Sequence, residues 1–188
     1  MNARLRRLYA DYRDVSAQFA GHPFIRIVPL RGNPPEAYEI HYRVKGLELD
    51  PTSHRPRIRT EHVAQIYLQD TYPREKPKCV MTTPIFHPNF GSYICIDDYW
   101  FAGSTLADII VHIGEMIQYQ NYNPKSPLDP VAARWAEQNE KLLPVGNDNL
   151  YQPEVDIDFF GEGGGEATPV AAEPAPEPAE EDMGIELC

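Results

Sequence analysis

The amino-acid sequence predicts an α+β fold: an amphipathic helix at the amino terminus, a four-stranded antiparallel meander, a long loop, a central buried helix and a carboxy-terminal helix. Two observations carry this prediction. Apolar residues recur at helical spacing near both ends of residues 1–146, and short alternating segments lie between them. A third observation, a sharp change of composition after about residue 153, adds a disordered acidic tail.

The first helix is predicted over residues 2–20. Its apolar face is formed by Leu5, Leu8, Tyr9, Tyr12, Val15 and Phe19. Gly21 and Pro23 end the pattern. Arg4, Arg6 and Arg7 lie at its start, where positive charge opposes the helix dipole, so they do not stabilise the helix. A docking role for a partner protein and a merely solvated surface are both compatible with this cluster.

Four strands are predicted next. They span residues 24–30, 38–44, 63–68 and 79–82. Apolar and polar residues alternate most clearly in the second of them, as a half-buried strand requires. Hairpin-like spacing predicts an antiparallel meander that helices cover on one face. Cys79, in the last strand, is interpreted as a core residue.

Two more helices follow the long loop. The central one carries the apolar stripe Leu106, Ile109, Ile110, Ile113 and Ile117, with Ser104 or Thr105 as its cap. The last begins at Asp129-Pro130, a cap followed by a favoured first residue, and stops at Pro144. The sequence therefore divides into a domain at 1–146, an acidic and apolar segment at 147–160 that is expected to dock on the domain or on a partner, and a disordered tail at 161–188.

Charge and cysteine content narrow the class of protein. The formal charge of −11 arises from the last 35 residues, where eleven Asp and Glu stand without Lys or Arg, so the domain is electroneutral. Nucleic acid is therefore not expected as a partner. Three cysteines, Cys79, Cys95 and Cys188, suggest neither a disulfide framework nor a zinc site, and no stretch approaches the ~20 apolar residues of a membrane span. A reducing cytoplasm is the expected location.

The most informative motif places Cys95 six residues after the tripeptide His87-Pro88-Asn89. A short loop that contains glycine and ends between Ile94 and Ile96 can present a sulfur at the surface while its backbone is anchored. On general grounds, an inert buried cysteine is the alternative.

Several neighbouring motifs resemble the catalytic domain of ubiquitin-conjugating enzymes over about residues 2–143. They are Tyr72-Pro73 followed by Pro77, then His87-Pro88-Asn89, Ile94-Cys95-Ile96-Asp97, Trp100, and Asn123-Pro124-Lys125-Ser126-Pro127. The resemblance implies that Cys95 accepts a ubiquitin-like modifier as a thioester from an ATP-dependent activating enzyme and passes it to a lysine of a target protein. This chemistry needs no metal and no organic cofactor.

The resemblance also assigns roles to individual residues. Asn89 matches an oxyanion-stabilising or loop-stabilising asparagine, and these two roles are left open here. Asp97 and Ser126 match positions that line the approach of the lysine, although Ser126 is equally compatible with a turn cap. His87, together with Pro88, is expected to anchor the loop, and the first helix, with its arginines, is expected to bind the activating enzyme.

The sequence departs from the family pattern in ways that concern partners. Arg74 replaces an apolar residue, and Phe101-Ala102-Gly103 replaces the Ser-Pro-Ala that usually contacts RING-type ligases, so an ordinary RING ligase is not expected. The interval from His87-Pro88-Asn89 to Cys95 and the stretch from Cys95 to Trp100 also look shorter than in typical members of the family. With these shortened loops, the chain looks most like the conjugating enzymes of compact prokaryotic ubiquitin-like pathways.

Three other functions compete with conjugation. A catalytically inactive binding module of the same fold would lack Cys95. A cysteine hydrolase that pairs Cys95 with His87 is disfavoured because a short tight loop does not easily bring the imidazole against the sulfur. A cysteine phosphatase would need an arginine in the loop after Cys95, and none follows.

Overall fold

The computed structural model describes residues 2–97, 99–101 and 103–151. Its helices and strands are α1 (Ala3–Gln18), β1 (Ile25–Gly32), β2 (Pro35–Tyr42), β3 (Gly46–Leu49), β4 (Pro56–Arg59), β5 (His62–Tyr67), β6 (Lys78–Met81), α2 (Leu106–Ile117), α3 (Pro130–Gln138) and the 3₁₀ turn η1 (Glu140–Leu142). This arrangement confirms the predicted α+β fold. The predicted tail at 161–188 and most of the segment at 147–160 lie outside the described residues.

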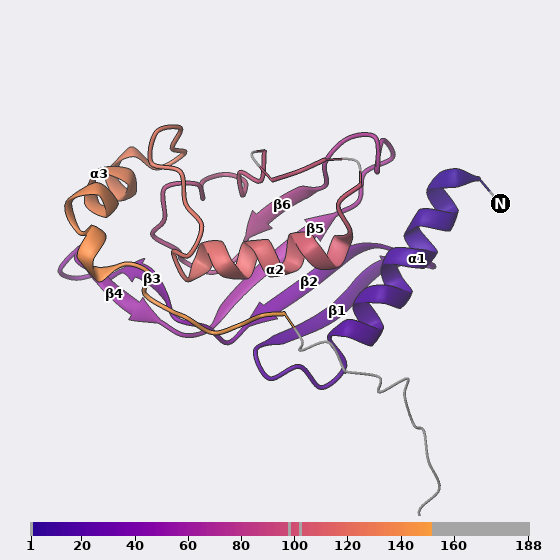
Figure 1. Ribbon diagram of the computed structural model, residues 1–188, viewed down its shortest axis with the longest axis horizontal. Coiled ribbons are helices and arrows are strands. Elements are labelled where there is room, and N and C mark those ends of the chain that lie inside the picture. Colours follow the sequence, from indigo (N-terminus) through magenta and orange to yellow (C-terminus); the bar gives the residue numbers. More distant parts are fainter. Residues whose placement is uncertain (1, 98, 102, 152–188) are drawn as a thin grey trace, which may run out of the picture. The chain divides into compact units, whose positions relative to one another are not determined.

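The main sheet has the strand order β1-β2-β5-β6, and each pair is antiparallel (Figure 1). These are the four predicted strands, with ends that shift by a few residues. The prediction missed the two-stranded sheet of β3 and β4, which lies between the second and third strands along the chain. In that sheet Glu48 is buried because Arg57 and Arg59 both bond its carboxylate, at 2.7 and 2.8 Å.

Helix α1 is fastened to the rest of the domain by a buried carboxylate. Asp11 is only 3% exposed and accepts hydrogen bonds from Arg7 and, at 2.7 Å, from the hydroxyl of Tyr72. It also accepts the backbone N–H of Leu106, in the first turn of α2. A paired and hydrogen-bonded carboxylate is tolerated in the interior. Asp11 therefore joins α1, the Tyr72-Pro73 turn and α2.

Helix α2 forms the centre of the hydrophobic core and crosses the sheet (Figure 1). Every residue of its predicted stripe is essentially inaccessible to solvent: Leu106, Ile109, Ile110, Ile113 and Ile117. Of the two predicted caps, Thr105 holds the position, and it forms a reciprocal capping box with Asp108. Helix α2 thus packs against the loops that follow β6, within the same hydrophobic core.

Helix α3 begins after Asp129, as predicted, but ends at Gln138, and η1 continues to Leu142 before Pro144. The chain then runs extended along α2 (Figure 1). Within it, Leu150 is 1% exposed and packs so closely on Gly114 that a Cβ added there would lie 2.3 Å from Leu150 Cδ1. Residues 147–151 thus lie on the domain itself. No helix within the described part of the chain has the length and apolar character to span a membrane.

Candidate active site

The loop that leads to Cys95 is closed by its own backbone. The N–H of Cys95 donates to the carbonyl of Asn89 at 2.9 Å, and the N–H of Ile94 donates to Cys79 in β6 at 2.8 Å. Ile94 and Ile96 are 3% and 2% exposed, whereas Cys95 between them is partly exposed. The two isoleucines anchor the backbone in the core, so the sulfur of Cys95 is presented outward, as the alternation of the sequence predicts.

His87 lies fully inside the domain. Its ring packs between Phe90 and Tyr119, and its Nδ1 accepts the backbone N–H of Asn89 at 3.1 Å. Burial lowers its pKa to about 3, so the ring is neutral near pH 7. A buried neutral imidazole that bonds the loop backbone fits a structural anchor and not a general base for Cys95.

Pro88 and Asn89 connect this loop to the segment before α3. The carbonyl of Pro88 accepts the N–H groups of Leu128 and Asp129 at 2.7 and 3.0 Å. The side-chain amide of Asn89 accepts the N–H of Asn123 at 2.7 Å and donates to the carbonyls of Asn123 and Ser126, at 2.9 and 3.4 Å. The oxygen and the nitrogen of the Asn89 amide are therefore both hydrogen-bonded to the neighbouring loop.

Asp97 lies between the sulfur of Cys95 and the amine of Lys76. Its Oδ2 accepts a hydrogen bond from Cys95 Sγ at 3.5 Å, and its Oδ1 bonds Lys76 Nζ. The bond to Lys76 holds the pKa of Asp97 below its ordinary value, so the group is a carboxylate near neutral pH. Burial raises the pKa of Cys95, and the adjacent Asp97 carboxylate adds to that rise.

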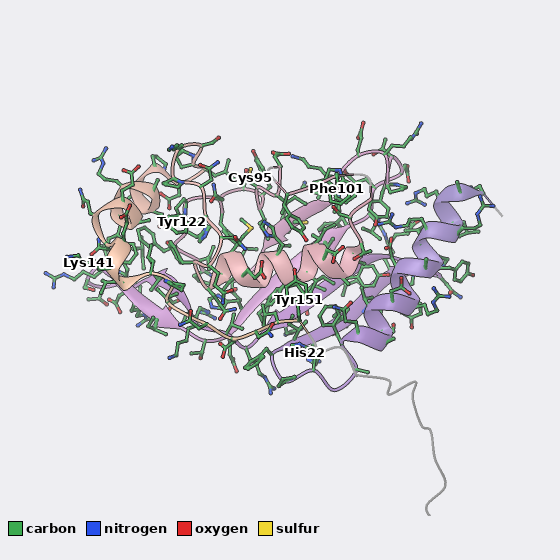
Figure 2. The ribbon with its side chains drawn as sticks, viewed as in Figure 1. His22, Cys95, Phe101, Tyr122, Lys141 and Tyr151 are labelled. Atoms are coloured by element: carbon green, nitrogen blue, oxygen red, sulfur yellow. The ribbon has the colours of Figure 1, made fainter. Side chains whose placement is uncertain are left out.

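These groups share a groove of about 370 Å³ beside α2. All four predicted catalytic residues line it: Asn89, Cys95, Asp97 and Ser126. Ser126 is solvent-exposed at the end of the 123–126 loop. Figure 2 shows Cys95 above α2, with Tyr122 to one side of it and Phe101 to the other. Residues far apart in the sequence are thus assembled around one sulfur.

The prediction missed other residues of this groove. Tyr99 and His112 stack with their ring centroids 4.0 Å apart and line the groove together with Asn121. Lys76 also belongs to this site, and its sequence context gives no sign that its amine bonds Asp97. His112, which lies among the apolar residues of α2, is an available signal, since a polar residue in a largely buried helix needs a hydrogen-bond or stacking partner.

Cys79 does not compete with Cys95 as a reactive thiol. Cys79 is 2% exposed, and burial raises the pKa of its thiol to about 12, in agreement with a core role. Cys188 lies outside the described residues.

Arg4 and Arg7, which are predicted to bind a partner, form bonds within the domain. Arg4 bonds Glu36 at 2.8 Å and the carbonyl of Leu68 at 3.0 Å. Arg7 bonds Asp11 and the hydroxyl of Tyr72. Both are largely covered, with side chains 25% and 22% exposed. Arg6 is exposed on the same helix.

Two of the residues that depart from the ligase-binding pattern, Arg74 and Phe101, lie at the surface. Arg74 is exposed in the turn after Tyr72-Pro73, and Phe101 is 64% exposed. Ala102 lies outside the described residues.

Comparisons with known proteins match part of this chain to one family. Residues 59–143 match the family model described as ubiquitin-conjugating enzyme. Ubiquitin-conjugating enzyme E2 K of Homo sapiens is 32% identical over 85 residues, which cover 42% of each chain. Ubiquitin-conjugating enzyme E2 27 of Arabidopsis thaliana is 35% identical over 84 residues, 42% of this chain and 43% of that one.

A solved structure described as a novel ubiquitin-conjugating enzyme shares the fold. The TM-score is 0.53 at 21% sequence identity, and the match covers 73% of this chain and 87% of that one. The family-model match over residues 59–143 and the curated relatives agree on the ubiquitin-conjugating enzyme family, and the solved structure shares the fold. The chain matches less than half the length of the curated relatives above.

Proposed function

We propose that the protein carries a ubiquitin-like modifier as a thioester on Cys95 and transfers it to a lysine amine of a target protein. The observation that carries this proposal is the position of Cys95: its sulfur is partly exposed in the groove and is hydrogen-bonded to Asp97 at 3.5 Å. The match of residues 59–143 to the ubiquitin-conjugating enzyme family supports the same chemistry. A thioester suits a carrier, because sulfur is both a good nucleophile and a good leaving group.

In this proposal an activating enzyme forms the first acyl bond with ATP and hands the modifier to Cys95 by thioester exchange. The raised pKa of Cys95 keeps most of the thiol protonated near pH 7. Exchange then depends on the small thiolate fraction or on a base brought by the activating enzyme. The first helix, on which Arg6 is exposed, is the proposed contact with that enzyme.

In the second step Asp97 orients the incoming lysine. Because its carboxylate is ionised near neutral pH, it attracts an ammonium group to the side of Cys95 and is a weak base toward it. Asn89 holds the wall of the groove through the 123–126 loop, on which Ser126 borders the path of the lysine.

The alternative function is an inactive binding module that only holds a ubiquitin-like protein. The accessible sulfur beside a carboxylate favours the conjugating enzyme over this alternative.

Reconstitution tests the proposal. With a cognate modifier, its activating enzyme and ATP, we expect an adduct on non-reducing gels that a thiol reagent removes. Cys95→Ala should abolish this adduct, whereas Cys79→Ala and Cys188→Ala should retain it. An adduct that persists in Cys95→Ala and disappears in Cys188→Ala would refute the proposal.

We further propose that an ordinary RING ligase is not the recruiting partner. Arg74 would have to lose its hydration where the family uses an apolar anchor, and loss of a well-packed anchor removes ~2 kcal/mol or more of binding energy. Arg74→Phe should therefore strengthen binding to a RING domain in a titration. Strict dependence of transfer on a RING protein that contacts Arg74 would contradict the idea.

A further inference from the structure

The amine of Lys76 and the reactive sulfur of Cys95 bond the same side chain of the protein. One carboxylate, that of Asp97, bonds Lys76 Nζ through Oδ1 and Cys95 Sγ through Oδ2, the latter at 3.5 Å. The two oxygens of a carboxylate are bonded to the same carbon, so groups bonded to them lie near one another. Lys76 therefore places a primary amine beside the sulfur that, in the proposed function, carries an activated acyl group.

The amine of Lys76 can move away from Asp97, because both side chains are partly exposed. Lys76 and Asp97 are 38% and 52% exposed, and ion pairs between exposed side chains contribute little to stability. The lysine side chain has four rotatable carbon–carbon bonds, so it can leave the carboxylate and still reach a group attached to Cys95.

The other lysines do not share this position. The chain has five lysines, Lys45, Lys76, Lys78, Lys125 and Lys141, and all of them are described by the structure. Among these, Lys76 is the one bonded to a carboxylate that lines the groove. Lys125 stands next to Ser126 at the groove edge and is exposed, which makes it a matched control.

We propose that Lys76 is a modification site: an internal acceptor that takes the acyl group from Cys95. This inference rests on the proposed function. The neutral amine attacks the thioester carbonyl carbon, a carbon–nitrogen bond forms, and the carbon–sulfur bond breaks. The electron pair leaves with the sulfur, which then takes up a proton, while the nitrogen releases its extra proton to Asp97 or water.

The product is an amide on Lys76 and a free thiol on Cys95. It needs no oxidant, reductant or further reactant. An acyl group on Lys76 resists thiol reagents, whereas the same group on Cys95 is removed by them, so the two sites are distinguishable in one sample. Because proximity raises the effective concentration of the amine, transfer to Lys76 should exceed transfer to the other lysines by about tenfold or more.

A fluorescein-labelled Gly-Gly peptide, activated as the thioester of mercaptoethanesulfonate, tests the inference without any partner protein. The full-length Cys188→Ala protein is incubated with this probe in mildly alkaline buffer. It is then divided, treated with or without dithiothreitol, digested and analysed by mass spectrometry. The dithiothreitol-resistant label at each lysine is expressed relative to the dithiothreitol-sensitive label on Cys95.

We expect the resistant label to concentrate on Lys76. Lys76→Arg retains the positive charge beside Asp97 but cannot form an amide. This variant should lower the total resistant label on all lysines, relative to the sensitive label on Cys95, by about tenfold. Lys125→Arg and Lys78→Arg should leave the label on Lys76 in place, and Cys95→Ala should remove it.

The opposite results separate the two claims. Sensitive label on Cys95 combined with resistant label spread evenly over the lysines would overturn the inference and leave the proposed function standing. Label on Lys76 that persists in Cys95→Ala would also overturn it, because the probe would then acylate the amine directly. Absence of both the sensitive label on Cys95 and the resistant label on Lys76 would overturn the inference, whereas the proposed function is decided by the reconstitution with the activating enzyme and ATP.

Discussion

Asn89 has two competing roles, and the structure gives each a different energetic signature. Its buried amide, 4% exposed, joins the Cys95 loop to the 123–126 loop. The bonds are an N–H received from Asn123 at 2.7 Å, one donated to the carbonyl of Asn123 at 2.9 Å, and a longer one to Ser126 at 3.4 Å. If this connection is its function, its removal should weaken the fold.

The substitution Asn89→Ala therefore has a calculable cost. Two good hydrogen bonds are each worth about 1 kcal/mol, and an unpaired backbone group of Asn123 costs about 1–3 kcal/mol more if water does not reach it. We expect the free energy of unfolding to fall by about 2–5 kcal/mol in urea titrations. Alkylation of Cys95 by iodoacetamide should also change, because the loop that presents the sulfur loosens.

Asn121→Ala is the matched control for stability. This side chain is exposed and donates to Glu115 at 2.7 Å, so its removal should change the free energy of unfolding by less than about 0.5 kcal/mol. The structural role of Asn89 would be refuted if Asn89→Ala unfolded at the wild-type urea concentration and charged normally but released its acyl group slowly to free lysine. That pattern belongs to an oxyanion donor.

Three further predictions follow from other parts of the chain. Asp97→Asn removes a negative charge that raises the pKa of Cys95, so the alkylation rate of Cys95 should rise at a lower pH than in the wild type; an unchanged or more alkaline profile would contradict the assignment. Leu150→Ala should lower the free energy of unfolding by about 2–4 kcal/mol, since the side chain is 1% exposed, whereas Leu142→Ala, at 62% exposed, should be nearly neutral in the same urea titration. Truncation after residue 160 should leave discharge to free lysine unchanged but alter the salt dependence of charging, because the removed residues carry net negative charge only; loss of discharge would instead assign the tail to the active site.

Periodic segments were predictable because their information is local. The apolar stripe of α2 and the alternation of apolar and polar residues in β2 each predict which face of the element is buried. In the structure those faces are buried. The sheet of β3 and β4 was missed because its strands are short and one carries Glu48 inward. That side chain is buried only because Arg57 and Arg59 from the opposite strand bond it.

The residues of the site likewise divide into those that a local motif predicts and those that only the fold brings together. Cys95, Asn89, Asp97 and Ser126 were found by motif, and they line one groove. The contacts of Arg4 with Glu36 and of Lys76 with Asp97 join residues 32 and 21 positions apart, and no local pattern contains them. The likeness to prokaryotic pathways rests on loop lengths and stays a prediction.

The central claim is that Cys95 alone carries the modifier. A Cys79→Ala, Cys188→Ala double variant retains Cys95 as its single cysteine, and intact-protein mass spectrometry after incubation with modifier, activating enzyme and ATP measures charging directly. We predict a mass increase equal to the modifier less one water, reversed by dithiothreitol. Failure of this variant to charge, with a dithiothreitol-reversible adduct on the Cys95→Ala protein instead, would contradict the claim.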